Sequence, residues 1–155
     1  MAKELMDSIT LRAASAGDIV DVAGIFARSR AAALPFLPVL HSGEEDIAFF
    51  GRYLDSGLIT LAERADEKLG FLAETPGWIE HLYLEPEQRG QGIGRLLVEA
   101  AKHRQDQLQL WCFNDNLAGR AFYIRQGFIE IGRTDGDNEA GLPDILFGWQ
   151  RAGLT

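Results

Sequence analysis

The sequence predicts an α/β fold, in which helices cover both faces of a single sheet. Two observations predict this class. Strand-like apolar segments alternate with helix-like segments along the 155 residues. In addition, the apolar segment 78–84 leads through a glycine-rich loop directly into an amphipathic segment, as a strand leads into a helix. Because no repeat, low-complexity stretch or linker divides the chain, we expect one domain over residues 1–155.

The first half of the chain is expected to form a strand, two helices and a hairpin. A capping box begins each helix, Ser15-x-x-Asp18 for the first and Ser42-x-x-Glu45 for the second. The apolar loop 33–41 between them contains two prolines, which prevent it from continuing a helix. The second helix should end at Ser56-Gly57. Alternation and turn signals place strands at residues 9–12, 58–62, 68–73 and 78–84.

The second half is expected to contain two more helices and three more strands. The helix that begins near Ile93 repeats apolar residues every three or four positions, so one of its faces should pack on the sheet. The cluster 114–116, Asn-Asp-Asn, is a natural N-cap for the next helix. The strands are predicted at residues 108–113, 129–133 and 145–149, the last two separated by the glycine-rich and acidic insertion 134–144.

The glycine loop before the third helix is suited to bind an anion. Gly90, Gly92 and Gly94 leave the first backbone N–H groups of the helix uncovered by side chains, and the helix dipole adds positive charge there. A P-loop would need a Lys-Ser/Thr pair where Arg95-Leu96 stand, and a dinucleotide-binding loop would need glycine at Arg95. The spacing therefore excludes both of these phosphate sites.

Two signatures resemble a known family. Arg89, Gly92 and Gly94 fill the pattern [Arg/Gln]-x-x-Gly-x-[Gly/Ala], and residues 116–128 match Asn-x-x-Ala-x-x-Phe-Tyr-x-x-x-Gly-Phe at nearly every position. Residues 78–132 thus resemble the GNAT superfamily of acetyl-CoA-dependent N-acetyltransferases. Asn116 stands one position closer to the alanine than in many members, so Asp115 could equally match the family's asparagine. The resemblance implies a mixed, mostly antiparallel seven-stranded sheet with splayed parallel central strands and four flanking helices.

The resemblance also implies the donor substrate. Acetyl-CoA would place its pyrophosphate on the glycine loop and its pantetheine arm between the splayed strands 78–84 and 108–113, where the backbone of 82–84 would pair with it as a missing strand would. We expect no metal. The implied cofactor-binding residues are Leu82, Tyr83, Leu84, Arg89, Gly90, Gln91, Gly92, Ile93, Gly94, Arg95, Asn116 and Tyr123.

Tyr123 matches the signature tyrosine and is expected to be the acid that protonates the departing thiolate. A phenol has a reference pKa near about 10, so it can donate a proton at neutral pH. At helical spacing Tyr123 falls opposite the apolar cluster, so we expect its side chain to point away from the main core. The alternative is an exposed or interface tyrosine. That cluster is Leu117, Ala118, Ala121 and Ile124.

Glu80 is the candidate base. Strand alternation puts it on the face of Trp78, Leu82 and Leu84, with His81 on the opposite face, so only one of the two should meet the acceptor. The alternative is a solvent-facing glutamate paired with a cation. Tentative acceptor contacts are Phe36, His41, Glu45 and Glu80.

The composition of the chain indicates which classes of partner to expect. The net charge of −8 argues against nucleic acid, and it suits a cationic acceptor as well as mere solubility. No apolar run is long enough to cross a bilayer, and Cys112 alone forms no intrachain disulfide, so we expect a soluble, cytoplasmic protein with a buried structural thiol. The sequence does not decide whether the protein forms a homodimer.

We therefore expect direct acetyl transfer to a primary amine, preferably of a small molecule. The alternatives are a protein N-terminus or lysine as acceptor, a non-catalytic acyl-CoA sensor, and an interaction domain that uses the apolar loop 34–40 as a partner surface.

Overall fold

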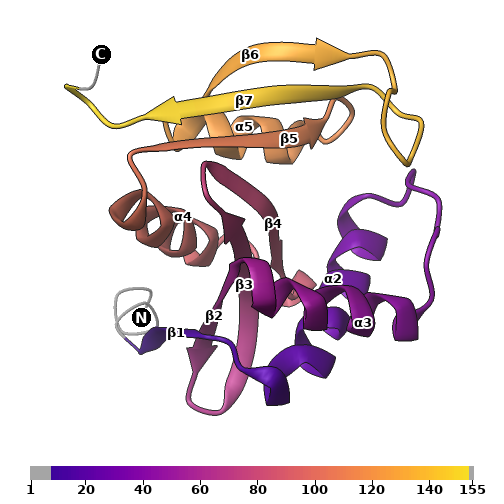
Figure 1. Ribbon diagram of the computed structural model, residues 1–155, viewed down its shortest axis with the longest axis vertical. Helices are drawn as coiled ribbons and strands as arrows, with labels where there is room; N and C mark the ends of the chain where they lie inside the picture. Colours follow the sequence, from indigo (N-terminus) through magenta and orange to yellow (C-terminus); the bar gives the residue numbers. More distant parts are fainter. Residues whose placement is uncertain (1–7, 154–155) are drawn as a thin grey trace.

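The computed structural model describes residues 8–153, which form one seven-stranded sheet with helices on both faces (Figure 1). The strands run in the order β1-β2-β3-β4-β5-β7-β6 across the sheet. In chain order the elements are β1 (Ile9–Ala13), η1 (Ala16–Asp18), α2 (Ile19–Ala33), α3 (Gly43–Ser56), β2 (Leu58–Arg64), β3 (Glu67–Thr75), β4 (Trp78–Leu84), η2 (Pro86–Gln88), α4 (Ile93–Arg104), β5 (Gln107–Phe113), α5 (Leu117–Arg125), β6 (Ile129–Thr134) and β7 (Asp144–Gln150).

The two central strands are parallel and separate along their length. β4 and β5 pair at the single position where Trp78 faces Gln109, whereas β5 pairs with antiparallel β7 along its whole length. All other neighbouring strands are antiparallel. The predicted mixed, mostly antiparallel sheet with splayed central strands and four α-helices is therefore confirmed for the described residues.

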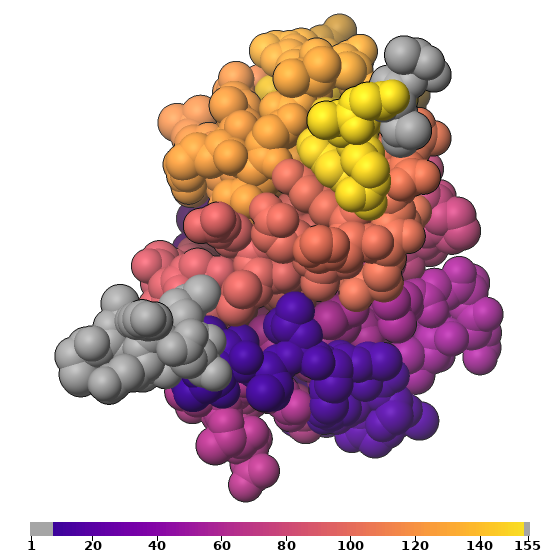
Figure 2. Space-filling view, turned by 90° about the vertical axis from the view of Figure 1, so that its left-hand side faces the viewer, coloured from indigo at the N-terminus to yellow at the C-terminus, as the bar shows by residue number. Residues whose placement is uncertain are grey.

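Apolar side chains fill both faces of the sheet. On one face α4 buries Leu97 and Val98, and on the other face Val22 of α2 and Phe50 of α3 pack on the sheet. Figure 1 shows α4 and the pair α2 and α3 on opposite sides of β2, β3 and β4. Figure 2 shows α4 across the middle of one face of the molecule, between β1 and the C-terminal strand. The glycine loop thus joins a central strand to a helix anchored by the core.

Of the two predicted capping boxes, one begins the helix α3 and the other begins only the short helix η1. At Ser42 the box forms as expected, because Glu45 N donates to Ser42 Oγ at 3.2 Å and Ser42 N donates to the Glu45 carboxylate at 3.0 Å. At Ser15 the same pattern starts the short η1, and α2 begins only at Ile19. Asp18 is buried there and accepts hydrogen bonds from Arg12 of β1, so it ties the first helix to the edge strand.

The predicted orientation of α5 is wrong. Leu117 and Ile124, expected to face the core, are 69% and 60% exposed, whereas Phe122 and Tyr123 pack against the core cluster that includes residues of α4 and β7. An aromatic ring removes more apolar area from water than an aliphatic side chain does, so a nine-residue helix gains more by burying its two rings. Tyr123 therefore points inward, toward the gap between the strands.

Candidate functional site

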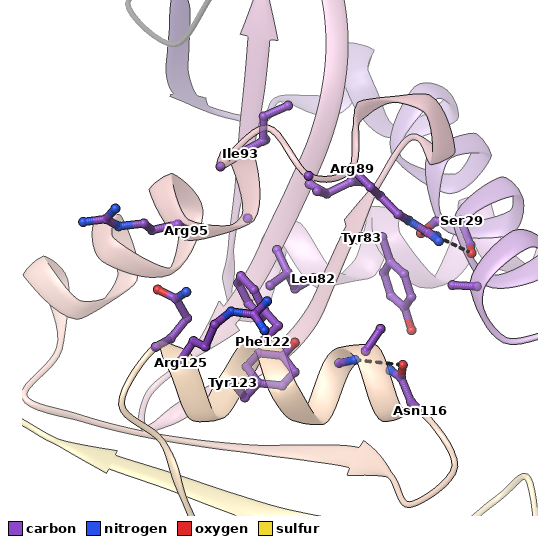
Figure 3. Close-up of a pocket in the computed structure, with 18 of the residues that line it drawn as sticks. Ser29, Leu82, Tyr83, Arg89, Ile93, Arg95, Asn116, Phe122, Tyr123 and Arg125 are labelled. Carbon is purple, nitrogen blue, oxygen red and sulfur yellow. Dashed lines mark hydrogen bonds between the residues drawn. The ribbon is translucent and has the colours of Figure 1, made fainter. Parts of the chain in front are cut away.

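A cavity of about 490 Å³ lies between the end of β4, the start of α4 and α5 (Figure 3). Every residue predicted to bind the cofactor lines this cavity except Gln91, which accepts a hydrogen bond from Arg64 at 3.1 Å. Residues from three separate stretches of the sequence thus meet around one space. The sequence did not predict that α2 and α5 would also line the cavity, through Ser29, Ala33 and the following Leu34, and through Ala118, Gly119, Phe122, Arg125 and the following Gln126.

The glycine loop owes its shape to backbone conformations that favour glycine. Gly90 and Gly92 have φ values of 77° and 82°, in the left-handed region that side chains rarely adopt. No atom lies within 4 Å of the position of a Cβ on Gly90, so the backbone there is open to a ligand. Gly94 lies close to α5: a Cβ there would come 3.2 Å from the Phe122 ring, so the ring would have to shift by about a few tenths of an ångström.

The arginines around the cavity have different partners. Arg89 donates to the carbonyl oxygen of Ser29 at 3.1 Å and to its hydroxyl at 3.3 Å, so it ties the loop to α2 (Figure 3). Arg95 and Arg125 line the cavity and form no ion pair with any residue in 8–153. Two cations therefore stand free beside the loop, where a phosphate-bearing ligand would need them. Arg125 lies inside the second signature, but the pattern does not specify that position.

Asn116 begins α5 and also faces the site. Its Oδ1 accepts from Gly119 N at 3.0 Å, which makes it the N-cap. A Cβ on Gly119 would lie 2.3 Å from the Asn116 amide, so glycine is required for this contact. Asn116 lines the cavity and Asp115 does not, which favours Asn116 as the counterpart of the family's asparagine.

A second cavity, of about 90 Å³, opens between β4 and β5 and shares part of its wall with the first. The shared residues are Leu34, Leu82, Tyr83, Asn116 and Tyr123. Glu80 and His81 of β4 and Trp111 of β5 line only the second cavity. The splayed strands thus create two adjoining spaces, one beside the glycine loop and one beside Glu80.

Tyr123 stands where the two cavities meet. Its ring packs against Phe128 and Phe147, with centroids 5.8 and 6.2 Å away. Burial raises the pKa of its phenol, so the hydroxyl keeps its proton at neutral pH. In Figure 3 Tyr83 extends from β4 toward α5, the helix that carries Tyr123.

A β-bulge in β4 overturns the predicted alternation. Ala73 pairs with His81 and Glu74 pairs with Ile79, which leaves Glu80 as the extra residue. Ile79, and not Glu80, therefore joins Leu82 and Leu84 in one apolar cluster. Glu80 is exposed and accepts from Thr75 Oγ1 at 3.0 Å. Contrary to expectation, both Glu80 and His81 reach the second cavity.

His81 lies inside a cluster of aromatic rings. The surrounding centroids are 5.2 to 6.1 Å from the imidazole and belong to Phe26, Phe49, Phe50, Tyr53 and Tyr83. Burial, with a smaller contribution from the charge of Arg30, lowers the pKa of His81 to about 4. The imidazole is therefore neutral at neutral pH and adds no positive charge to the second cavity.

Three of the four tentative acceptor residues lie away from both cavities. Phe36 is 40% exposed, in the apolar loop before α3. His41 lies 3.3 Å from Glu45 and also contacts Glu139, and these carboxylates raise its pKa. This contact joins the α2–α3 loop to the β6–β7 loop, which meet in Figure 1. Only Glu80 of the four lines a cavity.

No helix within residues 8–153 is long and apolar enough to cross a membrane.

Comparisons with known proteins agree with this architecture. A family model described as an acetyltransferase (GNAT) domain matches residues 55–130. The chain is 36% identical over 73 residues to the peptidyl-lysine N-acetyltransferase YjaB of Salmonella typhimurium, over 47% of this chain and 50% of that protein. The match therefore spans half the length of this relative.

Solved structures resemble nearly the whole chain. The solution structure of apo YjaB from Escherichia coli superposes with a TM-score of 0.77 at 25% identity, over 93% of this chain and 99% of that one. A PaiA N-acetyltransferase from Thermoplasma acidophilum, crystallised with coenzyme A, has a TM-score of 0.75 at 18% identity, over 92% and 99% of the two chains. The second likeness concerns the fold alone.

Proposed function

Because the chain belongs to the GNAT family of acetyltransferases, we propose that it transfers the acetyl group of acetyl-CoA directly to a primary amine. Acetyl-CoA is the cosubstrate of this family. The observation that carries the proposal is that the two cavities adjoin and share Tyr123 in their walls. A donor bound along the first cavity and an acceptor in the second would meet at that side chain.

The first cavity fits the chemistry of acetyl-CoA. Its pyrophosphate would meet the open backbone at Gly90, the N-terminus of α4 and the unpaired Arg95 and Arg125. The strand edge at residues 82–84 has no partner in β5, because β4 pairs with β5 only at Trp78. Backbone N–H and C=O groups at such an edge suit the amides of a pantetheine arm.

The second cavity supplies groups for the transfer itself. An amine must lose a proton before it attacks a thioester, and Glu80 lies beside the space that an acceptor would fill. Tyr123 keeps its proton at neutral pH and is the group we assign to protonate the thiolate. The neutral His81 would not repel an ammonium group that enters beside Glu80.

For the acceptor we propose an aliphatic primary amine. A cavity of about 90 Å³ has room for a narrow chain. A small-molecule amine remains the first candidate. A lysine side chain of a protein is the second, which is favoured by the activity named for the YjaB relatives.

Two measurements test the proposal. Acetyl-CoA at about 100 times its Kd should stabilise the folded protein by about 2.7 kcal/mol, and thus raise Tm by roughly 5–10 °C for a chain of this size. Release of free CoA thiol should follow when amines, polyamines or lysine peptides are added. A Tm shift without thiol release would indicate an acyl-CoA sensor. Neither effect at millimolar acetyl-CoA would contradict the proposed function.

A further inference from the structure

Arg30 lies on the face of α2 that is turned toward the second cavity. It follows Phe26 by one helical turn, so these two side chains share a face, and α2 ends three residues later, just before Leu34. Phe26 contacts the rings of His81 and Tyr83, with centroids 5.9 and 5.0 Å away, and Leu34 lines both cavities. Arg30 is thus placed beside the acceptor cavity without lining it.

The half-buried guanidinium of Arg30 lacks the hydrogen bonds that most other arginines in 8–153 form. Its Cζ lies 5.1 Å from the centre of the Phe26 ring, and its Nε is buried without a hydrogen-bond partner. The other arginines in 8–153 whose side chains form no hydrogen bond are exposed, namely Arg52, Arg95 and Arg125. The buried Nε has lost water without gaining a hydrogen bond, which costs free energy.

The surroundings of Arg30 do not neutralise its charge. His81 is neutral and Tyr83 keeps its proton, because burial acts on the pKa of both groups. Burial raises the pKa of Asp46 on α3, and the charge of Arg30 opposes this only in part; no ion pair joins these two residues. The planar fork of a guanidinium therefore has its donors available for a carboxylate, which it can bind through two hydrogen bonds.

We propose that Arg30 binds a carboxylate of the acceptor, so that the acceptor is an amino-carboxylate whose amine enters the second cavity. The amine would lie near Glu80 and Tyr123 while the acid group remains at α2. Opposite charges at the two ends of the acceptor would fix its direction in the site. This inference rests on the proposed function, because it assumes that the second cavity receives the amine.

The sharpest test compares two acceptors that share one amine. Nα-acetyl-lysine and Nα-acetyl-lysine amide have the same side chain and differ only in the carboxylate. Wild type should use the acid with kcat/KM about tenfold or more above that for the amide, chiefly through KM. Arg30→Met should abolish this ratio, Arg30→Lys should keep part of it, and Arg52→Met, which removes an exposed unpaired arginine from α3, should leave it unchanged.

A binding experiment keeps this test independent of turnover. Calorimetric titration with Nα,Nε-diacetyl-lysine, which resembles the product, should show binding to wild type that Arg30→Met weakens at least tenfold. The acetyl-CoA melting shift of the variant should match that of wild type, which shows that the donor site is intact. If Arg30→Met fails to fold, Arg30→Gln replaces it in both assays.

Three results would overturn the inference. They are equal kcat/KM for the acid and the amide, a preference for lysine peptides that lack a nearby carboxylate, and equal binding of the diacetyl-lysine to wild type and variant. Absence of thiol release with every amine would instead contradict the proposed function, and the calorimetric comparison would still decide the role of Arg30.

Discussion

Because burial keeps His81 neutral, we expect the free energy of unfolding to fall as the pH is lowered. Burial lowers its pKa from 6.5 to about 4 in the folded protein. Between these values the unfolded chain binds a proton that the folded protein does not. The stability due to this group is therefore complete above about pH 6.5 and is lost as pH falls toward 4. The difference between the two pKa values corresponds to about 3.4 kcal/mol in full, of which about 3 kcal/mol is lost by pH 4.

His81→Phe isolates this effect, because a phenyl ring keeps the aromatic packing and cannot be protonated. Urea unfolding of both proteins at several pH values between 8 and 4 gives the difference in unfolding free energy at each pH. Carboxylates titrate in both proteins and cancel in this difference. Wild type should lose about 3 kcal/mol relative to His81→Phe on acidification. His103→Phe changes an exposed histidine of α4 and keeps His81, so this control should lose about as much as wild type relative to His81→Phe.

A difference between wild type and His81→Phe that stays constant from pH 8 to 4 would refute the reasoning. His81 would then accept a proton without cost, and its ring cluster would be hydrated. The second cavity would also gain a positive charge on mild acidification, and binding of an ammonium group there would weaken as pH falls.

Three further predictions concern the site and its support. Tyr123→Phe should lower kcat about 10²- to 10⁴-fold with little change in acetyl-CoA affinity, since the ring contacts remain; steady-state kinetics with unchanged kcat would remove Tyr123 from the acid role. Gly94→Ala places a Cβ within 3.2 Å of α5, so calorimetry should show weaker acetyl-CoA binding, whereas Gly51→Ala, with open space around it, should bind normally. Asp18→Asn should cost about 1–2 kcal/mol at pH 7, a reduced value because its partner Arg12 is 42% exposed. Arg12 lowers the pKa of Asp18, so this stability is present above about pH 4 and lost below it, and thermal unfolding should find the two proteins closer at pH 3.

Local signals explain what the sequence predicts well. β4 covers the predicted residues 78–84, and α4 begins directly after Gly92. A left-handed φ of 82° at Gly92 depends on the residue itself and its immediate neighbours, as does an N-cap at Asn116. The glycine loop can therefore be predicted from the sequence, because its backbone conformation depends only on residues a few positions apart.

Pairing between distant segments explains what the sequence does not predict. The bulge at Glu80 arises from the register of β4 with β3, which alternation along one strand cannot reveal. The contact of His41 with Glu139 joins residues 98 positions apart. Tyr123 turns inward because Phe128 and Phe147 offer it aromatic contacts from outside its helix. The acceptor side of the site therefore depends on tertiary packing, whereas the donor side depends largely on local sequence.

The splay of β4 from β5 links the two sides energetically. It leaves the edge of residues 82–84 without a strand partner and opens the second cavity beside Glu80. Unpaired backbone groups at a partly buried edge carry a cost that a bound ligand can remove by hydrogen bonding. A pantetheine arm that filled this edge would also form one wall between the two cavities. The acceptor site would then be complete only with the donor bound, and acetyl-CoA should bind before the amine.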